Sequence, residues 1–141
     1  MYDIPADVRR SECEKYATLF GMKDSLYAPI SSYSHGMQQK IVLIGALVTQ
    51  PKLMVLDEPM VGLDPKSAFN LKELMKTLAK EGRSVFFSTH VLDVAEKFCD
   101  RVGIINHGKL IAEGSLEELR HTEHSEGGSL EDIFLELTDN E

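Results

Sequence analysis

The stretch Leu-Met-Val-Leu-Asp-Glu-Pro at residues 53–59 constrains this chain most, because four apolar residues run directly into two adjacent carboxylates. Such a run predicts a buried strand that carries Asp57 and Glu58 at its carboxyl end. Open parallel sheets place their ligands at that end of the strands. Two neighbouring carboxylates repel each other unless a cation or a polar partner is present, so the pattern predicts a site for a metal-bound anion.

Three further segments accompany this strand. A second apolar strand at residues 85–87 ends in Ser-Thr-His at residues 88–90, and a Gly-Leu-Asp-Pro turn occupies residues 62–65. Upstream, Tyr-Ser-His-Gly-Met-Gln-Gln-Lys at residues 33–40 leads into a helix that is apolar nearly all round and that we expect to be buried. Ser34 is a good N-cap for this helix, and the free N–H groups of a helix start suit an anion.

In this order the motifs resemble the signature motif, Walker B motif, D-loop and H-loop of ATP-binding cassette (ABC) ATPases, over about residues 1–120. The Tyr-Ser-x-Gly-Met form is similar to exporters of the bacitracin-resistance type. The resemblance implies an α/β fold with a P-loop NTPase-type parallel sheet flanked by helices. Residues 1–48 would be a remnant of the helical signature subdomain, 49–120 the C-terminal part of the ATPase core, and 121–141 a linker and C-terminal helix.

The resemblance also implies roles for the residues at the ends of the two strands. Asp57 would hold Mg²⁺ through its water shell, and Glu58 would be the general base that orients the attacking water. His90 would hydrogen-bond the γ-phosphate of ATP and link it to Glu58. ATP and Mg²⁺ are therefore the expected cofactors.

The signature segment would bind the nucleotide of a second subunit through Ser34, His35, Gly36 and Met37. The commonest family pattern is Leu-Ser-Gly-Gly-Gln, so Ser34 and Gly36 match it, while Tyr33, His35 and Met37 depart from it. A plain surface position is the other interpretation of His35.

Asp64 belongs to the D-loop, and the resemblance implies that it reaches across the interface between two subunits. Its alternative role is to cap a helix that begins near Lys66, and the two roles are compatible.

The P-loop that holds phosphates in this family, G-x-x-x-x-G-K-[ST], does not precede Ser34. Residues 103–110 come close, but Leu110 replaces the hydroxyl residue and the segment predicts a hairpin with a His107-Gly108 turn. The P-loop strand is therefore expected to be absent and the sheet incomplete. We expect the chain alone to be inactive as an ATPase, and poorly soluble, dimerised or partly molten because its strand edges are open.

Composition favours a cytosolic globular chain, with 43% hydrophobic and 27% charged residues and no apolar run of membrane-spanning length. Cys13 and Cys99 lack metal-binding spacing and are expected to stay reduced. A net charge of −8 argues against a nucleic-acid partner.

The expected function is that of an ATP-binding and hydrolysing subunit of an ABC transporter. Its partners would be a transmembrane permease subunit and a second nucleotide-binding domain in a head-to-tail dimer, with the chain in the cytoplasm on the inner face of the membrane. One alternative is a soluble ABC-type ATPase acting on nucleic acid or the ribosome, against which the acidic charge speaks. Another is a non-catalytic fragment that only binds partner subunits, which the missing P-loop favours.

Helix signals fill most of the remaining chain. Cys13, Tyr16, Ala17 and Phe20 share one helical face. A capping box at residues 115–118 opens a short helix. A last helix begins at Ser129, with Asp132 three residues on, and is expected to dock either on the core or on a partner. The polar residues 121–128 predict a linker in which His121 and His124 are solvated.

Overall fold

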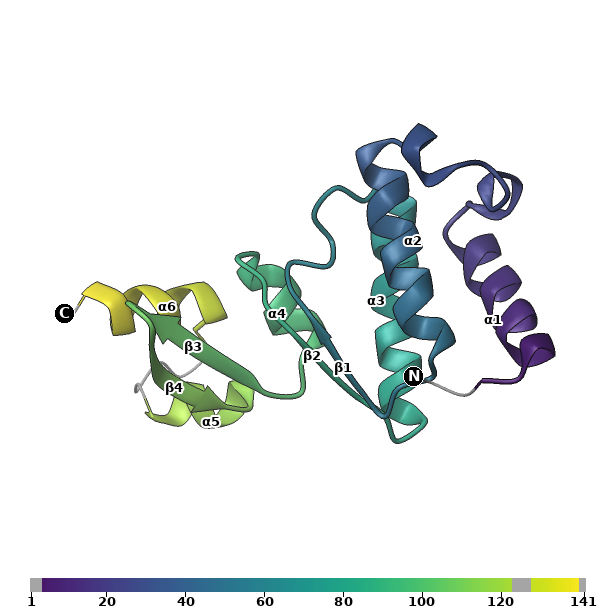
Figure 1. The fold of residues 1–141 in the computed structure, drawn as a ribbon. Coiled ribbons are helices and arrows are strands. Elements are labelled where there is room, and N and C mark those ends of the chain that lie inside the picture. The colour runs from purple at the N-terminus through teal and green to yellow at the C-terminus, as the bar shows by residue number, and fades with distance from the viewer. Residues whose placement is uncertain (1–3, 123–127, 140–141) are drawn as a thin grey trace. The chain divides into compact units, whose positions relative to one another are not determined.

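The computed structural model describes residues 4–122 and 128–139 (Figure 1). His124, in the predicted linker, lies outside these residues. The chain divides into two compact units, Met1–Ser88 and Thr89–Glu141. Within the described ranges no helix is long and apolar enough to cross a membrane.

The first unit contains three helices, α1 (Ala6–Leu19), α2 (His35–Val48) and α3 (Pro65–Lys80) (Figure 1). Two short 3-10 turns, Lys23–Ser25 and Ile30–Ser32, connect α1 to α2. The predicted face of α1 is confirmed, because Tyr16, Ala17 and Phe20 are buried against the hydrophobic core.

The sheet of the first unit consists of β1 (Leu53–Leu56) and β2 (Ser84–Phe87), paired in parallel. Together with its helices this gives the α/β fold expected from the sequence. Met54, Leu56, Val85 and Phe87 face the core.

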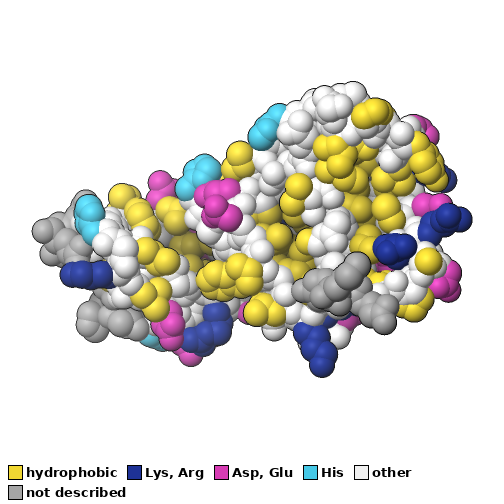
Figure 2. All heavy atoms as spheres, viewed as in Figure 1, with side chains coloured by type: hydrophobic (Ala, Val, Ile, Leu, Met, Phe, Trp, Pro, Cys, Tyr) yellow, Lys and Arg dark blue, Asp and Glu magenta, His cyan; other side chains and the backbone are white. Residues whose placement is uncertain are grey.

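The opposite face of this sheet is exposed, and the prediction of a buried β1 was wrong for this face. The exposed fractions are 56% for Leu53, 68% for Val55 and 66% for Phe86. The reason is that the helices of this unit cover one side of the two strands only (Figure 1). Hydrophobic side chains reach the surface of this unit at several places (yellow in Figure 2).

The expectation that α2 is buried all round was also wrong. Leu43, Ile44, Leu47 and Val48 are buried, but Val42 is 67% exposed. An apolar residue on an otherwise buried helix is left at the surface when no neighbouring element packs on its side of the helix.

The second unit contains α4 (Leu92–Phe98), the antiparallel strands β3 (Val102–Asn106) and β4 (Lys109–Gly114), and the helices α5 (Leu116–Thr122) and α6 (Leu130–Asp139). His107 and Gly108 both have positive φ, 45° and 76°, as a two-residue hairpin turn requires. The predicted hairpin is therefore confirmed. Lys109 begins a strand, so the segment that resembles a P-loop does not join a strand to a helix.

The predicted capping box at residues 115–118 is present, and a similar one opens the last helix. The Glu118 N–H donates to Ser115 Oγ (3.2 Å) and the Ser115 N–H to Glu118 Oε2 (2.7 Å). Ser129 and Asp132 exchange the same pair of bonds at the start of α6. Of the two roles left open for this last helix, the structure shows docking on the core of its own unit, since Leu130 and Ile133 are fully buried beside Ala95, Ile104 and Leu119.

Glu96 of α4 fastens α6 to its unit. One carboxylate oxygen pairs with Arg120 Nη2 (3.2 Å) and the other accepts the Leu130 N–H (3.3 Å). Arg120 Nε in turn donates to the Gly128 carbonyl (2.7 Å). The cysteines are free, as predicted, and burial raises the pKa of the Cys99 thiol.

The exposed sheet face generates a prediction about association. Phe86→Thr should reduce self-association in sedimentation velocity and change the free energy of unfolding little, because the Phe86 side chain is mostly in water. Phe87→Thr is the matched control, since Phe87 packs against the core; it should lower the free energy of unfolding by about 1–3 kcal/mol. If both variants lose the same free energy of unfolding, the sheet face that carries Phe86 is covered in solution and the prediction is wrong.

Candidate functional site

Asp57, Glu58 and Ser88 meet at the carboxyl end of the β1–β2 sheet. Leu56 pairs with Phe87 in the parallel register, so Asp57 and Ser88, the next residues of each strand, lie side by side. The Ser88 hydroxyl donates to Asp57 Oδ1 and accepts the Glu58 N–H at 3.1 Å. One hydroxyl therefore positions both acidic residues.

The sequence pattern did not assign a role to Ser88. Its signal was nevertheless present, because Ser88 directly follows an apolar strand, as Asp57 does. Only the register shows that the two residues are opposite each other.

Glu58 has an unusual backbone conformation. Its φ is +43°, in the left-handed region of backbone conformation. Residues other than glycine and asparagine rarely adopt this region. Such a conformation persists where surrounding contacts impose it. Here the Glu58 N–H is bound to Ser88, its carbonyl accepts the Val61 N–H (3.1 Å), and the following Pro59 is fully buried.

The donor set around Asp57 fits magnesium that arrives with a phosphate. Among residues 4–122 and 128–139 no group of three or more His, Cys, Asp or Glu side chains could form a metal cage. Mg²⁺ commonly keeps several waters and takes one or two protein carboxylates together with phosphate oxygens. Asp57 is exposed and can serve as such a carboxylate.

The signature segment forms the start of α2. Ser34 is its N-cap, and the Met37 N–H donates to Ser34 Oγ at 3.3 Å. Ser34 and His35 are exposed, and Gly36 and Met37 are half-buried. Tyr33 is buried and its hydroxyl donates to the Ser25 carbonyl (2.6 Å), so this departure from the commonest pattern holds the preceding loop.

The signature turn, residues 34–37 at the start of α2, and the D-loop of the same chain, residues 62–65, are in close contact. A Cβ atom added to Gly36 would lie 2.9 Å from the carbonyl oxygen of Gly62, so a side chain at residue 36 requires the backbone to move. A Cβ atom on Gly62 would lie 3.2 Å from Cδ2 of His35. His35 is thus a surface residue that lies against the D-loop.

Asp64 caps α3 and forms an ion pair with α2. Its carboxylate accepts from the Ser67 N–H (2.9 Å) and the Ser67 hydroxyl (2.7 Å), and Lys40 Nζ lies 2.5 Å from Oδ2. The bond to Lys40, followed by those to Ser67, holds the pKa of the Asp64 carboxyl well below its usual range. The capping role that the sequence suggested is confirmed; a reach across a subunit interface stays a prediction.

His90 belongs to the second unit, where it precedes α4 and is exposed. Its predicted link to Glu58 therefore stays a prediction. So do the domain boundaries at residues 48 and 120.

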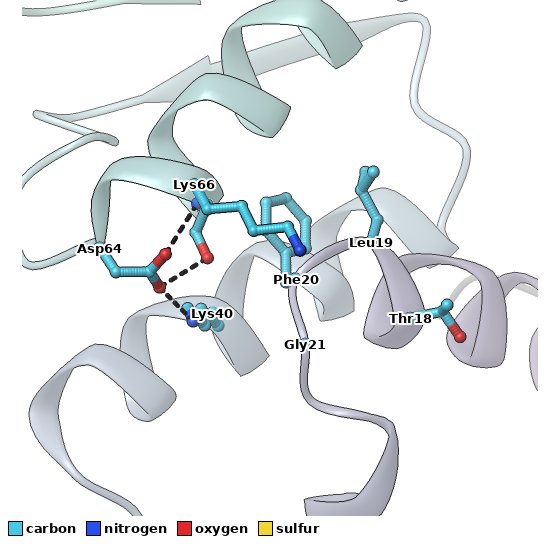
Figure 3. A pocket seen from close by; sticks show the side chains of 8 residues that line it. Thr18, Leu19, Phe20, Gly21, Lys40, Asp64 and Lys66 are labelled. Atoms are coloured by element: carbon cyan, nitrogen blue, oxygen red, sulfur yellow. Dashed lines mark hydrogen bonds and ion pairs between the residues drawn. The ribbon is translucent and has the colours of Figure 1, made fainter.

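A small cavity of about 160 Å³ lies beside the Lys40–Asp64 pair (Figure 3). Residues 18–21, at the end of α1 and just after it, line one side of it, and Lys66 and Ser67 line another. The Lys66 side chain extends toward Phe20 and away from Asp64 (Figure 3).

Comparison with known proteins identifies the family of the chain. A family model described as "AAA domain, putative AbiEii toxin, Type IV TA system" matches residues 5–92, so the chain belongs to this family of AAA-type ATPase domains. Its relatives and structural neighbours place it more narrowly among the ATP-binding proteins of ABC transporters.

Three curated relatives illustrate the similarity. An ABC transporter ATP-binding protein of Nostoc is 37% identical over 132 residues, which cover 90% of this chain and 39% of the relative. EcsA of Bacillus subtilis is 42% identical over 106 residues (75% and 43%), and NatA of the same organism is 32% identical over 135 residues (96% and 54%). The chain thus spans about half or less of the length of the curated relatives it matches.

Solved structures give the same result for the fold. The ATP-binding subunit of an ABC transporter superposes with a TM-score of 0.93 at 31% identity, over 97% of this chain and 57% of that one. The ATP-binding cassette MJ0796, a dimer in a post-hydrolysis state bound to ADP and Pi, gives a TM-score of 0.68 at 26% identity, over 80% and 49%.

The Asp64 contacts predict a dependence of stability on pH. Asp64→Asn keeps a capping side chain but leaves Lys40 without its anionic partner, and because Asp64 is partly exposed we expect a loss of only about 1 kcal/mol at pH 7. The folded-state pKa is depressed, so this contribution is full above the unfolded value and disappears as pH falls. Urea unfolding should therefore give a difference between the two proteins that is constant down to about pH 5 and shrinks toward pH 2.

Asp93→Asn is the matched control. Asp93 pairs with Lys97 at 2.6 Å, but both side chains are about two-thirds exposed. Its loss should change the free energy of unfolding by less than about 0.5 kcal/mol. A difference for Asp64→Asn that does not change with pH would contradict the assigned ionisation.

Proposed function

We propose that this chain is the C-terminal part of the ATP-binding subunit of an ABC transporter and supplies the residues that bind Mg²⁺, activate water and close the nucleotide site. The observation that carries the proposal is the placement of Asp57, Glu58 and Ser88 at the carboxyl ends of two parallel strands. This is the edge at which sheets of this kind bind ligands. The relatives named above are transporter proteins, which favours a transporter over an ATPase that acts on nucleic acid or the ribosome.

Asp57 would hold Mg²⁺, which would neutralise negative charge on the phosphate oxygens when bound. Glu58 is the general base: it orients the attacking water and accepts its proton. Ser88 fixes the Asp57 carboxylate and the Glu58 backbone, so that neither has to be ordered when the nucleotide arrives. We also assign to His90 the hydrogen bond to the γ-phosphate.

The signature residues act on a second subunit. Ser34 presents a hydroxyl, and the start of α2 presents N–H groups and the positive end of a helix dipole. His35, Gly36 and Met37 complete this surface, and Asp64 lies on the adjoining turn. Two nucleotide-binding domains then pair head to tail, as partners of a transmembrane permease on the cytoplasmic side of the membrane.

The phosphate cradle has to come from elsewhere, because these 141 residues contain no G-x-x-x-x-G-K-[ST] motif. We therefore expect no magnesium-dependent ATP hydrolysis by the chain alone. Mixed with an intact relative that carries a P-loop, the chain should raise turnover at the relative's site. Hydrolysis by the chain alone would overturn the assignment of its site.

Ser34→Arg tests the signature role in that mixture. A long cation at the start of α2 blocks close approach of the phosphates, so the stimulation of turnover should disappear. Ser31→Arg is the control, because Ser31 is an exposed serine three residues earlier; it should leave stimulation intact. Retained stimulation with Ser34→Arg would contradict the proposal.

Glu58→Gln tests the general base in a complete subunit in which a P-loop half is joined to this chain. Nucleotide binding should be kept and turnover should fall by about 10²–10⁴-fold, because glutamine cannot accept the proton. The control is Glu73→Gln, which changes an exposed carboxylate on α3. Equal turnover in the two variants would refute the base assignment.

A further inference from the structure

We propose that Lys40 is a positioning residue for ATP turnover: it joins the signature turn and the D-loop of one chain into a single unit that is presented to the partner's nucleotide. The functional part of this inference rests on the proposed function. Its structural part rests on contacts within the first unit alone.

Two sets of contacts hold these turns together. At one end, Gly36 of the signature turn approaches the Gly62 carbonyl so closely that a Cβ atom would lie 2.9 Å from it, and the His35 ring lies beside Gly62. At the other end, Lys40 pairs with Asp64 at 2.5 Å. The two sets join the first turns of α2 to the same short segment, residues 62–64.

The ion pair is unequal in its exposure. The Lys40 side chain is 15% exposed and the Asp64 side chain 47%. A cation in that setting needs its partner more than a surface lysine does, because water solvates it poorly. Lys40 is therefore held at Asp64, whereas exposed pairs such as Lys97 and Asp93 exchange freely with water.

Asp64 connects this pair to α3. The carboxylate oxygen that meets Lys40 also accepts the Ser67 hydroxyl, and the other oxygen accepts the Ser67 N–H (Figure 3). Ser34 caps α2 through the Met37 N–H in the same way. Lys40 is therefore paired with the residue that caps α3, and it belongs to the helix that Ser34 caps. Loss of its charge should loosen the Asp64 cap directly and the start of α2 through the close approach of Gly36 to Gly62.

Catalysis depends steeply on such placement, since a displacement of about 1 Å can cost on the order of 10²-fold in rate. The signature turn and the D-loop come from different parts of the sequence, and the proposed function presents both to one nucleotide. A residue that fixes their spacing therefore acts on turnover without touching the substrate.

The first test measures turnover of an intact relative stimulated by the full chain carrying Lys40→Met. Stimulated kcat should fall about tenfold at saturating chain, while the chain concentration for half stimulation changes less than about twofold. Lys40→Arg, which keeps the charge, should restore most of the loss. Lys66→Met is the matched control, because Lys66 lines the same cavity and points away from Asp64 (Figure 3).

The second test needs no ATPase activity and separates this inference from the proposed function. Hydrogen exchange of the chain alone should be faster in Lys40→Met at both the Met37 and the Ser67 N–H, and close to the original rate in Lys40→Arg. If Lys40→Met fails to fold, Lys40→Gln, which can still donate to Asp64, replaces it and should show the same effect more weakly.

The outcomes are distinct. Suppose that hydrogen exchange is faster at both caps in Lys40→Met, but that the unchanged chain does not stimulate turnover of the relative. This result would reject the proposed function and would support the structural coupling of the two turns. Faster exchange at Ser67 alone, or equal losses of kcat in Lys40→Met and Lys66→Met, would overturn the inference. Full stimulation by Lys40→Met would also overturn it.

Discussion

The parallel pairing of β1 with β2 is the constraint on which the first unit depends. Its register sets Leu56 opposite Phe87, and this alone brings the residues that follow each strand to one place. A shift by one residue would turn the core side chains of a strand to the other face and remove Ser88 from Asp57. The pairing also determines which side chains remain in water, because the alternation that turns Met54 and Val85 toward the core exposes Val55 and Phe86.

Local signals in the sequence predicted much of the architecture. The hairpin at His107 and Gly108, the capping box at Ser115 and the helix start at Ser129 depend on residues two to four positions apart, so the sequence contains the whole interaction. The helical stripe through Tyr16 and Phe20 depends on periodicity and was also correct. These elements need no knowledge of the rest of the chain.

The errors and omissions concern contacts between distant segments. The sequence could not show that β1 is covered on one face only, because its apolar run is the same for a strand covered on both. Nor did it assign roles to Ser88 or Lys40, whose partners are 31 and 24 positions away in the chain. For the candidate site, the pattern identified the acids and the helix cap but not the hydroxyl and the cation that hold them in place.

The left-handed backbone at Glu58 gives this position two opposing requirements. A glycine or an asparagine would suit the local conformation better and would favour folding. In the proposed role of general base, a glutamate supplies a carboxylate that can accept a proton from water, which glycine and asparagine lack. Selection for stability and selection for function would therefore favour different amino acids at position 58.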